Sequence, residues 1–302
     1  MPHLFPKTNI KFIEARWICI TVSAIIIVSG MITLAIRGAN WSIDFRGGLD
    51  IQVRFANPVT DGQVRASLAG SGVDEVKTIS GLGERDEMSI RLKSSENSGQ
   101  LQEQIRTKLE QAFPGNAVEI RNVQVVGPKV GRELRSQAAL SAVVAMILLL
   151  IYISWRFEFK FAVGGVVGLF HDTLLTIAFL SFFGYEFSLS VLAAILTLIG
   201  YSLNDTIVVY DRIRENLKKL RNMRLAEIMD LSINETLSRT VITSFTVFLT
   251  VLVLFIFGGS VLRGFSFTML VGVVTGTYSS IYISAPIVLE WAERTAIKGK
   301  KR

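Results

Sequence analysis

Six long apolar segments recur along the chain and are separated by polar stretches. Each holds close to the ~20 residues that an α-helix needs to cross a bilayer core of about 30 Å. The pattern predicts six membrane-spanning helices, with polar residues near the end of the fourth. The predicted spans are Trp17–Ile36, Ala138–Trp155, Phe161–Phe183, Leu189–Tyr210, Val241–Phe257 and Phe265–Leu289.

The stretch between the first two spans, residues 37–136, has the mixed composition of a soluble domain. Its patterns predict the order β-α-β-β-α-β, which is typical of a ferredoxin-like fold. The predicted elements are Leu49–Phe55, Thr60–Ala69, Asp74–Ser80, Met88–Lys93, Ser98–Phe113 and Ala117–Val126. We therefore expect a polytopic α-helical membrane protein with one small α+β domain between helices 1 and 2. This domain contains neither histidine nor cysteine, so it is either a binding or moving part or a passive cap.

The chain divides accordingly into four predicted parts. The N-terminus and first helix occupy residues 1–36, and the α+β domain occupies 37–136. Helices 2–6 occupy 137–289 and include a basic loop at 211–239, and a basic tail occupies 290–302.

Composition excludes several classes of protein. Half of the residues are hydrophobic, 19% are charged and the mean hydropathy is +0.45, which argues against a soluble enzyme. Cys19 is the only cysteine, so no disulfide can form within the chain. One cysteine and two histidines are also too few ligands for a structural zinc site. No phosphate-binding glycine loop of the G-x-x-x-x-G-K-[ST] type is present. ATP is therefore not the fuel of this chain, and we expect no cofactor and no metal.

The net charge of +7 reflects topology and does not indicate a nucleic-acid surface. With the N-terminus placed inside the cell, the inner segments hold seventeen lysines and arginines, and the short outer loops hold only Arg263. This asymmetry predicts that both termini are cytoplasmic and that residues 37–136 lie outside. The first span lacks a convincing cleavage site and is predicted to be an uncleaved helix.

Ionisable residues inside the spans indicate the chemistry. Each costs about 2.5–3.5 kcal/mol on insertion scales, so such residues suggest a role. His171 and Asp172 lie near the middle of the third span, Asn204 and Asp205 lie in the fourth, and Arg239 begins the fifth. A buried carboxylate beside a movable arginine is sufficient for a proton site, and Asp205 and Arg239 can meet if their helices pack together.

Each of these residues also has a structural interpretation. Arg239 is equally well an interfacial anchor, Asp205 a static hydrogen-bonding site, and His171 with Asp172 a fixed interhelical bond. The pairs Gly164–Gly168 and Gly272–Gly276 are expected to permit close helix packing. The basic segment 211–224 is expected to be a solvated face that fixes topology.

Two motifs resemble a known family. Asp44-Phe45-Arg46-Gly47-Gly48, just after the first span, resembles the D-F-x-G-G element of the SecD/SecF family. The run from Gly200 to Asn216 is similar to the fourth-span signature of the SecF branch, and His171-Asp172, Phe257-Gly258-Gly259 and Arg239 also fit. The resemblance extends from the first span to Leu289.

This resemblance implies an accessory subunit of the Sec protein-export machine in the bacterial inner membrane, within the resistance-nodulation-division superfamily. It assigns Asp205 and Arg239 to proton conduction. From their positions in the spans, we expect Asn204, His171 and Asp172 to act as relay or support. The resemblance assigns the outer domain to motion coupled with that of a SecD partner. SecYEG, YajC, YidC and the translocating preprotein are the further partners it implies.

Three functions remain to be distinguished. The first is a motor subunit in which proton flow drives late, ATP-independent export. The second is a non-conducting scaffold that docks SecD to the translocon. The third is a small-solute transporter, which would need a polar cavity, and the spans are expected to hold few polar residues beyond the charged set.

Overall fold

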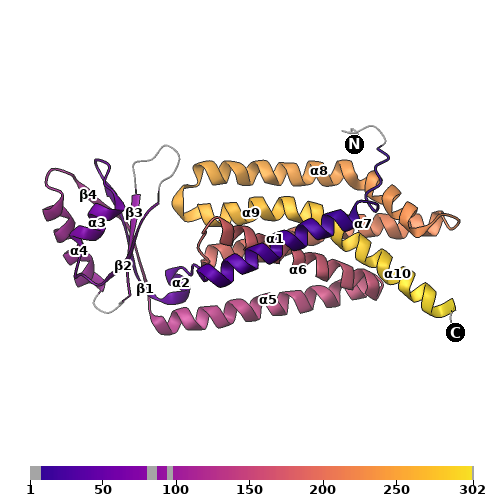
Figure 1. Ribbon diagram of the computed structural model, residues 1–302, viewed down its shortest axis with the longest axis horizontal. Coiled ribbons are helices and arrows are strands. Elements are labelled where there is room, and N and C mark those ends of the chain that lie inside the picture. Colours follow the sequence, from indigo (N-terminus) through magenta and orange to yellow (C-terminus); the bar gives the residue numbers. More distant parts are fainter. Residues whose placement is uncertain (1–7, 80–86, 94–97, 301–302) are drawn as a thin grey trace.

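The computed structural model describes residues 8–79, 87–93 and 98–300. A long helical bundle carries a small sheet domain at one end (Figure 1). Six helices of the described residues are long and apolar enough to cross a membrane, which confirms the predicted count. They are α1 (Arg16–Arg37), α5 (Pro128–Arg156), α6 (Phe159–Phe182), α7 (Leu189–Lys219), α8 (Leu225–Phe257), and a sixth made of α9 (Gly259–Ser279), a π-helical turn η1 (Ser280–Ser284) and α10 (Ala285–Lys300).

Several helices continue beyond their apolar windows. α5 begins ten residues before the predicted span. The segment expected as a basic loop, 211–239, is instead helical except for a turn at 220–224. The end of α7 and the start of α8 pack against each other in this segment. The Asn216 side-chain amide of α7 donates to Ser232 Oγ of α8 at 3.0 Å, and Ile213 of α7 and Met229 of α8 are buried.

The sheet domain has the predicted ferredoxin-like topology. Its described strands are β1 (Gly48–Phe55), β2 (Val73–Thr78), β3 (Glu87–Leu92) and β4 (Val118–Val126), and its helices are α3 (Asp61–Ser67) and α4 (Ser98–Ala112). The strand order is β2-β3-β1-β4, and every neighbouring pair is antiparallel. Alternation in β1 places Leu49, Ile51 and Val53 in a core that α3 and α4 cover with Val64, Ile105 and Leu109.

The connection from α1 to the sheet holds a short helix, α2 (Ile43–Arg46), that the sequence did not predict. The chain before it contacts the turn between α6 and α7. Ser42 N donates to Phe187 O at 3.0 Å, and Phe187 N donates to Asn40 O at 2.8 Å. The sheet domain is therefore attached to the bundle by backbone hydrogen bonds as well as by its two chain connections.

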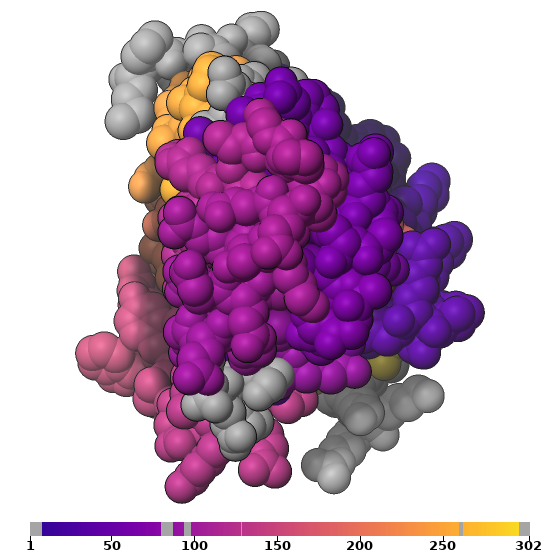
Figure 2. All heavy atoms as spheres, turned by 90° about the vertical axis from the view of Figure 1, so that its left-hand side faces the viewer, coloured from indigo at the N-terminus to yellow at the C-terminus, as the bar shows by residue number. Residues whose placement is uncertain are grey.

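Burial differs strongly among the spans. Between 44% and 67% of the residues are buried in the apolar windows of α6, α7 and the sixth span, against 6–17% in those of α1, α5 and α8. Both termini lie at the end away from the sheet domain (Figure 1), where Ile10 N and Ile13 N donate to Asn234 and Asp230 of α8. Viewed from the other end, the sheet domain covers most of the bundle (Figure 2). The chain is a multi-pass membrane protein, and the side that each end faces stays a prediction.

Candidate functional site

Asp172 of α6 accepts hydrogen bonds from two neighbouring helices. Its side chain is buried, and its Oδ2 accepts hydrogen bonds from Ser202 Oγ of α7 at 2.6 Å and from Ser279 Oγ of α9 at 2.7 Å. Its Oδ1 lies 3.1 Å from His171 Nδ1. Three helices therefore meet at one acidic side chain.

His171 extends this cluster towards α1. Its ring stacks on that of Tyr278, with centroids 6.1 Å apart and an angle of 29° between the planes. The Tyr278 hydroxyl donates to the Cys19 carbonyl at 2.6 Å and accepts from Ser23 Oγ at 3.0 Å. This arrangement suits a fixed interhelical contact as well as a relay, so both interpretations of His171 stand.

Asp205 lies one helical turn after Ser202 on α7 and is also buried. Its Oδ2 accepts from Ser244 Oγ of α8 at 3.1 Å, and Ser244 Oγ accepts from Thr277 Oγ1 of α9 at 2.7 Å. A chain of hydroxyl groups thus leads from α9 through α8 to the carboxylate. Chains of this kind can pass a proton, since each hydroxyl both donates and accepts.

Arg239 and Asn204 occupy different surroundings. Arg239 is exposed on α8, five residues before Ser244, which corresponds to about 7.5 Å along the helix. The described contacts include no ion pair between its side chain and that of Asp205. Asn204, directly before Asp205 on α7, is exposed. The structure therefore packs the two helices together, as the sequence analysis required, without joining Asp205 to Arg239.

Glycines allow the helices to approach closely at this level. A Cβ atom at Gly276 would lie 3.0 Å from Ser202 Cβ, and one at Gly168 would lie 2.0 Å from Ser284 Oγ. A Cβ at Gly272 would come within 2.5 Å of Leu198. These distances confirm the close packing predicted from the glycine spacing.

The expectation of few polar residues in the spans was wrong. Hydroxyl side chains line the buried faces of α7, α8 and α9, and three of them, Ser202, Ser244 and Ser279, contact the carboxylates. Serine and threonine are nearly neutral in hydropathy, so they do not interrupt an apolar window. Their recurrence every three or four residues, as in Thr236, Thr240 and Ser244, was the signal that could have revealed them.

The π-helical turn η1 directly follows Ser279 and was not predicted. Such turns are rare and are often found at functional sites. The Tyr210 hydroxyl of α7 donates to the Ser284 carbonyl at the end of this turn, at 3.2 Å. The irregular backbone is therefore held by a side chain of the helix that carries Asp205.

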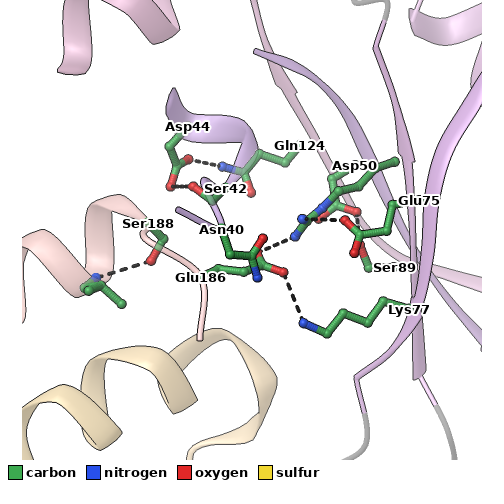
Figure 3. Close-up of polar contacts among 12 residues, drawn as sticks. Asn40, Ser42, Asp44, Asp50, Glu75, Lys77, Ser89, Gln124, Glu186 and Ser188 are labelled. Carbon is green, nitrogen blue, oxygen red and sulfur yellow. Dashed lines mark hydrogen bonds and ion pairs between the residues drawn. The ribbon is translucent and has the colours of Figure 1, made fainter. Parts of the chain in front are cut away.

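Asp44 forms the centre of the junction between bundle and sheet domain (Figure 3). Its Oδ2 accepts from Ser42 Oγ at 3.0 Å and from Leu189 N at 2.9 Å, and its Oδ1 accepts from Gln124 Nε2 at 2.7 Å. Leu189 is the first residue of α7 and Gln124 belongs to β4. Asp44 thus links α2 to β4, an edge strand of the sheet, and to α7, the helix that carries Asp205.

The backbone conformation after α2 requires two glycines. Gly47 and Gly48 have φ of 77° and 133°, and a Cβ at Gly48 would lie 2.5 Å from the Leu92 carbonyl oxygen. Both features exclude larger residues. The chain therefore turns tightly from α2 into β1, which sets Asp44 beside α7.

A cluster of charges lies next to Asp44 (Figure 3). Glu186, in the α6–α7 turn, pairs with Arg91 of β3 and with Lys77 of β2 at 3.6 Å, and Arg91 also pairs with Glu75 at 3.2 Å. Asp50 is buried beside them, and burial raises its pKa despite a hydrogen bond from Ser89. A cavity of about 800 Å³ opens here between the sheet and the end of the bundle.

Comparison with known proteins decides the family. The model described as "Protein export membrane protein SecD/SecF, C-terminal" matches residues 104–294, and the "SecD/SecF GG Motif" model matches residues 32–59, which include Asp44 and both glycines. The chain belongs to the SecD/SecF family.

Individual relatives agree with this assignment. The chain is 41% identical over 292 residues to the protein translocase subunit SecF of Desulfurispirillum indicum, covering 94% of this chain and 92% of that one. It is 40% identical over 288 residues to the subunit of the same name from Pseudomonas aeruginosa, covering 95% and 93%.

A solved structure shares the fold. The crystal structure of SecDF from Thermus thermophilus, described as a translocon-associated membrane protein, matches with a TM-score of 0.84 at 34% identity. The match covers 97% of this chain and 40% of SecDF. This SecD/SecF-family chain therefore spans less than half of the longer protein.

Proposed function

We propose that this chain is a SecF-type accessory subunit of the Sec protein translocase. Together with a SecD partner, it uses the proton-motive force to drive late, ATP-independent steps of preprotein export across the inner membrane. The observation that carries the proposal is Asp205, a buried carboxylate whose described contact is a hydroxyl that belongs to an interhelical chain. Family membership supports the choice of export as the work performed.

The proton chemistry follows from the surroundings of Asp205. A buried carboxylate without a neighbouring cation favours its neutral form, whereas an approaching arginine favours the charged form. Arg239 is exposed and near in depth, so a small relative movement of α7 and α8 changes its distance to Asp205. Alternating approach and withdrawal would release and take up one proton, driven by about 2.3 kcal/mol per charge per 100 mV.

The same helix offers a route from proton binding to movement outside the membrane. Leu189 N, at the start of α7, is held by Asp44, and Asp205 lies sixteen residues further along, about 24 Å of helix. A shift of α7 would therefore act on α2 and β4 through Asp44. In this proposal the sheet domain moves with the domain of SecD and acts on the emerging preprotein.

The proposed SecD partner follows from the part of SecDF that this chain matches. It corresponds to 40% of the SecDF chain, so a SecD subunit supplies the remainder. Association with SecYEG, and with YajC and YidC, is part of the same proposal. Both termini lie in the cytoplasm in this arrangement.

The decisive experiment measures gradient-dependent export in inverted vesicles that contain this chain and its SecD partner. Asp205→Asn is compared with wild type and with Asp211→Asn, a matched control six residues along on the same helix. Asp211 is half-exposed and pairs with Arg156 at the surface. We expect Asp205→Asn to assemble normally and to lose the gradient-dependent component, and Asp211→Asn to keep it.

Unchanged export by Asp205→Asn would favour the scaffold instead. In that case the closely packed glycine faces become the important feature, and Gly168→Val, which places a side chain against Ser284, would impair export by preventing assembly.

A further inference from the structure

The end of the bundle away from the sheet domain holds a groove between α1 and α10. Its volume is about 500 Å³. Its mouth carries Arg16 and Arg294, and its inner part is lined by Ile20, Pro286 and Ile287. We infer that this groove binds an anionic phospholipid, with the headgroup phosphate at the two arginines and one acyl chain along the isoleucines.

The two helices present the same chemical order with depth. α1 runs inward from Arg16 through Trp17 to Ile20, one turn deeper. α10 runs outward from Ile287 through Trp291, one turn later, to Arg294. Basic, aromatic and aliphatic side chains therefore follow one another in the same order along both walls, which reproduces the order of phosphate, interface and hydrocarbon in a bilayer.

The charged side chains at the mouth of the groove leave a net positive charge. Arg16 Nη1 donates to the Ile13 carbonyl at 3.0 Å, and Nη2 contacts Glu290 Oε1 at 3.2 Å. Its Nε is buried and has no hydrogen-bond partner in the described part of the chain. Glu290 balances Arg16, so Arg294, which is exposed, contributes the surplus charge that attracts an anion.

Aromatic side chains frame the opening. Trp17 is 56% exposed and Trp291 is 40% exposed, and the Arg16 guanidinium lies over the Trp17 ring at 5.5 Å. Indole rings favour the headgroup level of a membrane. Because α1 lies on the outside of the bundle, a lipid chain is the apolar molecule that can reach the groove from the side. Basic pockets between membrane helices are known to suit lipid phosphate groups.

The inference is independent of the proposed proton site and is tested by lipid retention. The purified full-length chain is mixed in detergent with equal amounts of phosphatidylglycerol and phosphatidylethanolamine, and bound lipid is counted by native mass spectrometry. We expect the wild type to retain phosphatidylglycerol in preference. Arg294→Gln, an exposed position that does not support the fold, should lower this retention about five-fold, the equivalent of about 1 kcal/mol for one basic residue near anionic lipid.

Two further variants separate the sources of binding. Arg221→Gln removes a charge from the exposed turn between α7 and α8 and should leave retention unchanged. Ile20→Trp keeps both arginines and fills the acyl half of the groove, so it should also reduce retention. Equal retention of both lipids by the wild type, an equal fall in Arg221→Gln, full retention by Ile20→Trp, or displacement of the lipid by excess inorganic phosphate would each overturn the assignment.

Discussion

Two groups of carboxylates in this chain have different surroundings. Inside the bundle, Asp172 and Asp205 are hydrogen-bonded by serine hydroxyls from neighbouring helices. At the junction with the sheet domain, Asp44 is held by a hydroxyl, a backbone amide and a side-chain amide, and the half-buried Glu186 by Arg91 and Lys77. Hydroxyls tolerate either protonation state of a carboxylate, whereas backbone amides and cations favour the charged form.

The difference separates two tasks within one helix. α7 carries Asp205 in its middle, where its described contact is the Ser244 hydroxyl, and is anchored at its first residue by Asp44. In the proposed function, a charge change at Asp205 would act at a distance because both contacts belong to one helix. The following changes test whether the two surroundings differ as described.

Loss of Asp44 should have the largest effect on the structure. Asp44→Ala removes three hydrogen bonds to a buried acceptor, and we expect it to cost about 2–3 kcal/mol of local stability at the junction. Hydrogen exchange of the amides at the start of α7 should accelerate about thirty-fold or more. Asp44→Asn is the control, because its amide oxygen still accepts. Unchanged protection of Leu189 would show that Asp44 does not anchor α7.

Substitution of Asp172 should cost less, because hydrogen bonds between membrane helices average about 0.6 kcal/mol each. Asp172→Leu leaves Ser202 and Ser279 without their shared acceptor, and we expect a loss of about 1–2 kcal/mol in the unfolding of the full chain in detergent. Asp172→Asn should lie between this variant and wild type. A leucine variant as stable as wild type would mean that the hydroxyls find other acceptors.

The ion pairs of Glu186 should contribute less again and should depend on salt. Glu186→Gln weakens the link to Arg91 and Lys77, both of which are partly exposed, so we expect a loss below about 1 kcal/mol. Raising the salt concentration should reproduce this loss in wild type and leave the variant almost unchanged. Hydrogen exchange of β2 and β3 measures both effects, and a variant that still responds fully to salt would contradict this role.

Asp50 should give the smallest effect, and one that depends on pH. Burial raises the pKa of its carboxyl, so the folded state holds the proton more readily than the unfolded state. The domain therefore gains stability as the pH falls through this raised pKa, and the gain is complete below the ordinary aspartate value of about 3.9. Asp50→Asn should be more protected than wild type in β1 at neutral pH and equal to it near pH 4. A constant difference across this range would exclude the titration of Asp50 as its cause.

The sequence predicted the elements well where one pattern dominates. In β1, apolar residues alternate with polar ones because only one side of the strand faces the core. Ile105 and Leu109 are one helical turn apart for the same reason. These patterns were therefore enough to predict the ferredoxin-like order of strands and helices. The lengths of the apolar windows gave the six spans. By contrast, α2, the helical hairpin at 211–239 and the π-turn at 280–284 were missed, because their backbone is set by contacts with other parts of the chain.

The same distinction applies to the site. The cost of placing a charge in a membrane singled out Asp172, Asp205 and His171 from the sequence. The serines that contact them could not be predicted in this way. The position of a serine within an apolar helix does not indicate which other helix it will contact.

Composition and hydropathy thus determined the membrane character, the number of spans and the positions of the charged residues within them, because burial and solvation act on each residue separately. The tertiary structure alone decided that Asp44 binds a backbone amide 145 residues away, that Ser244 and not Arg239 contacts Asp205, and that α1 and α10 face each other across a basic groove. These are pairings between distant segments. Their energies depend on distance and geometry that exist only once the helices have packed.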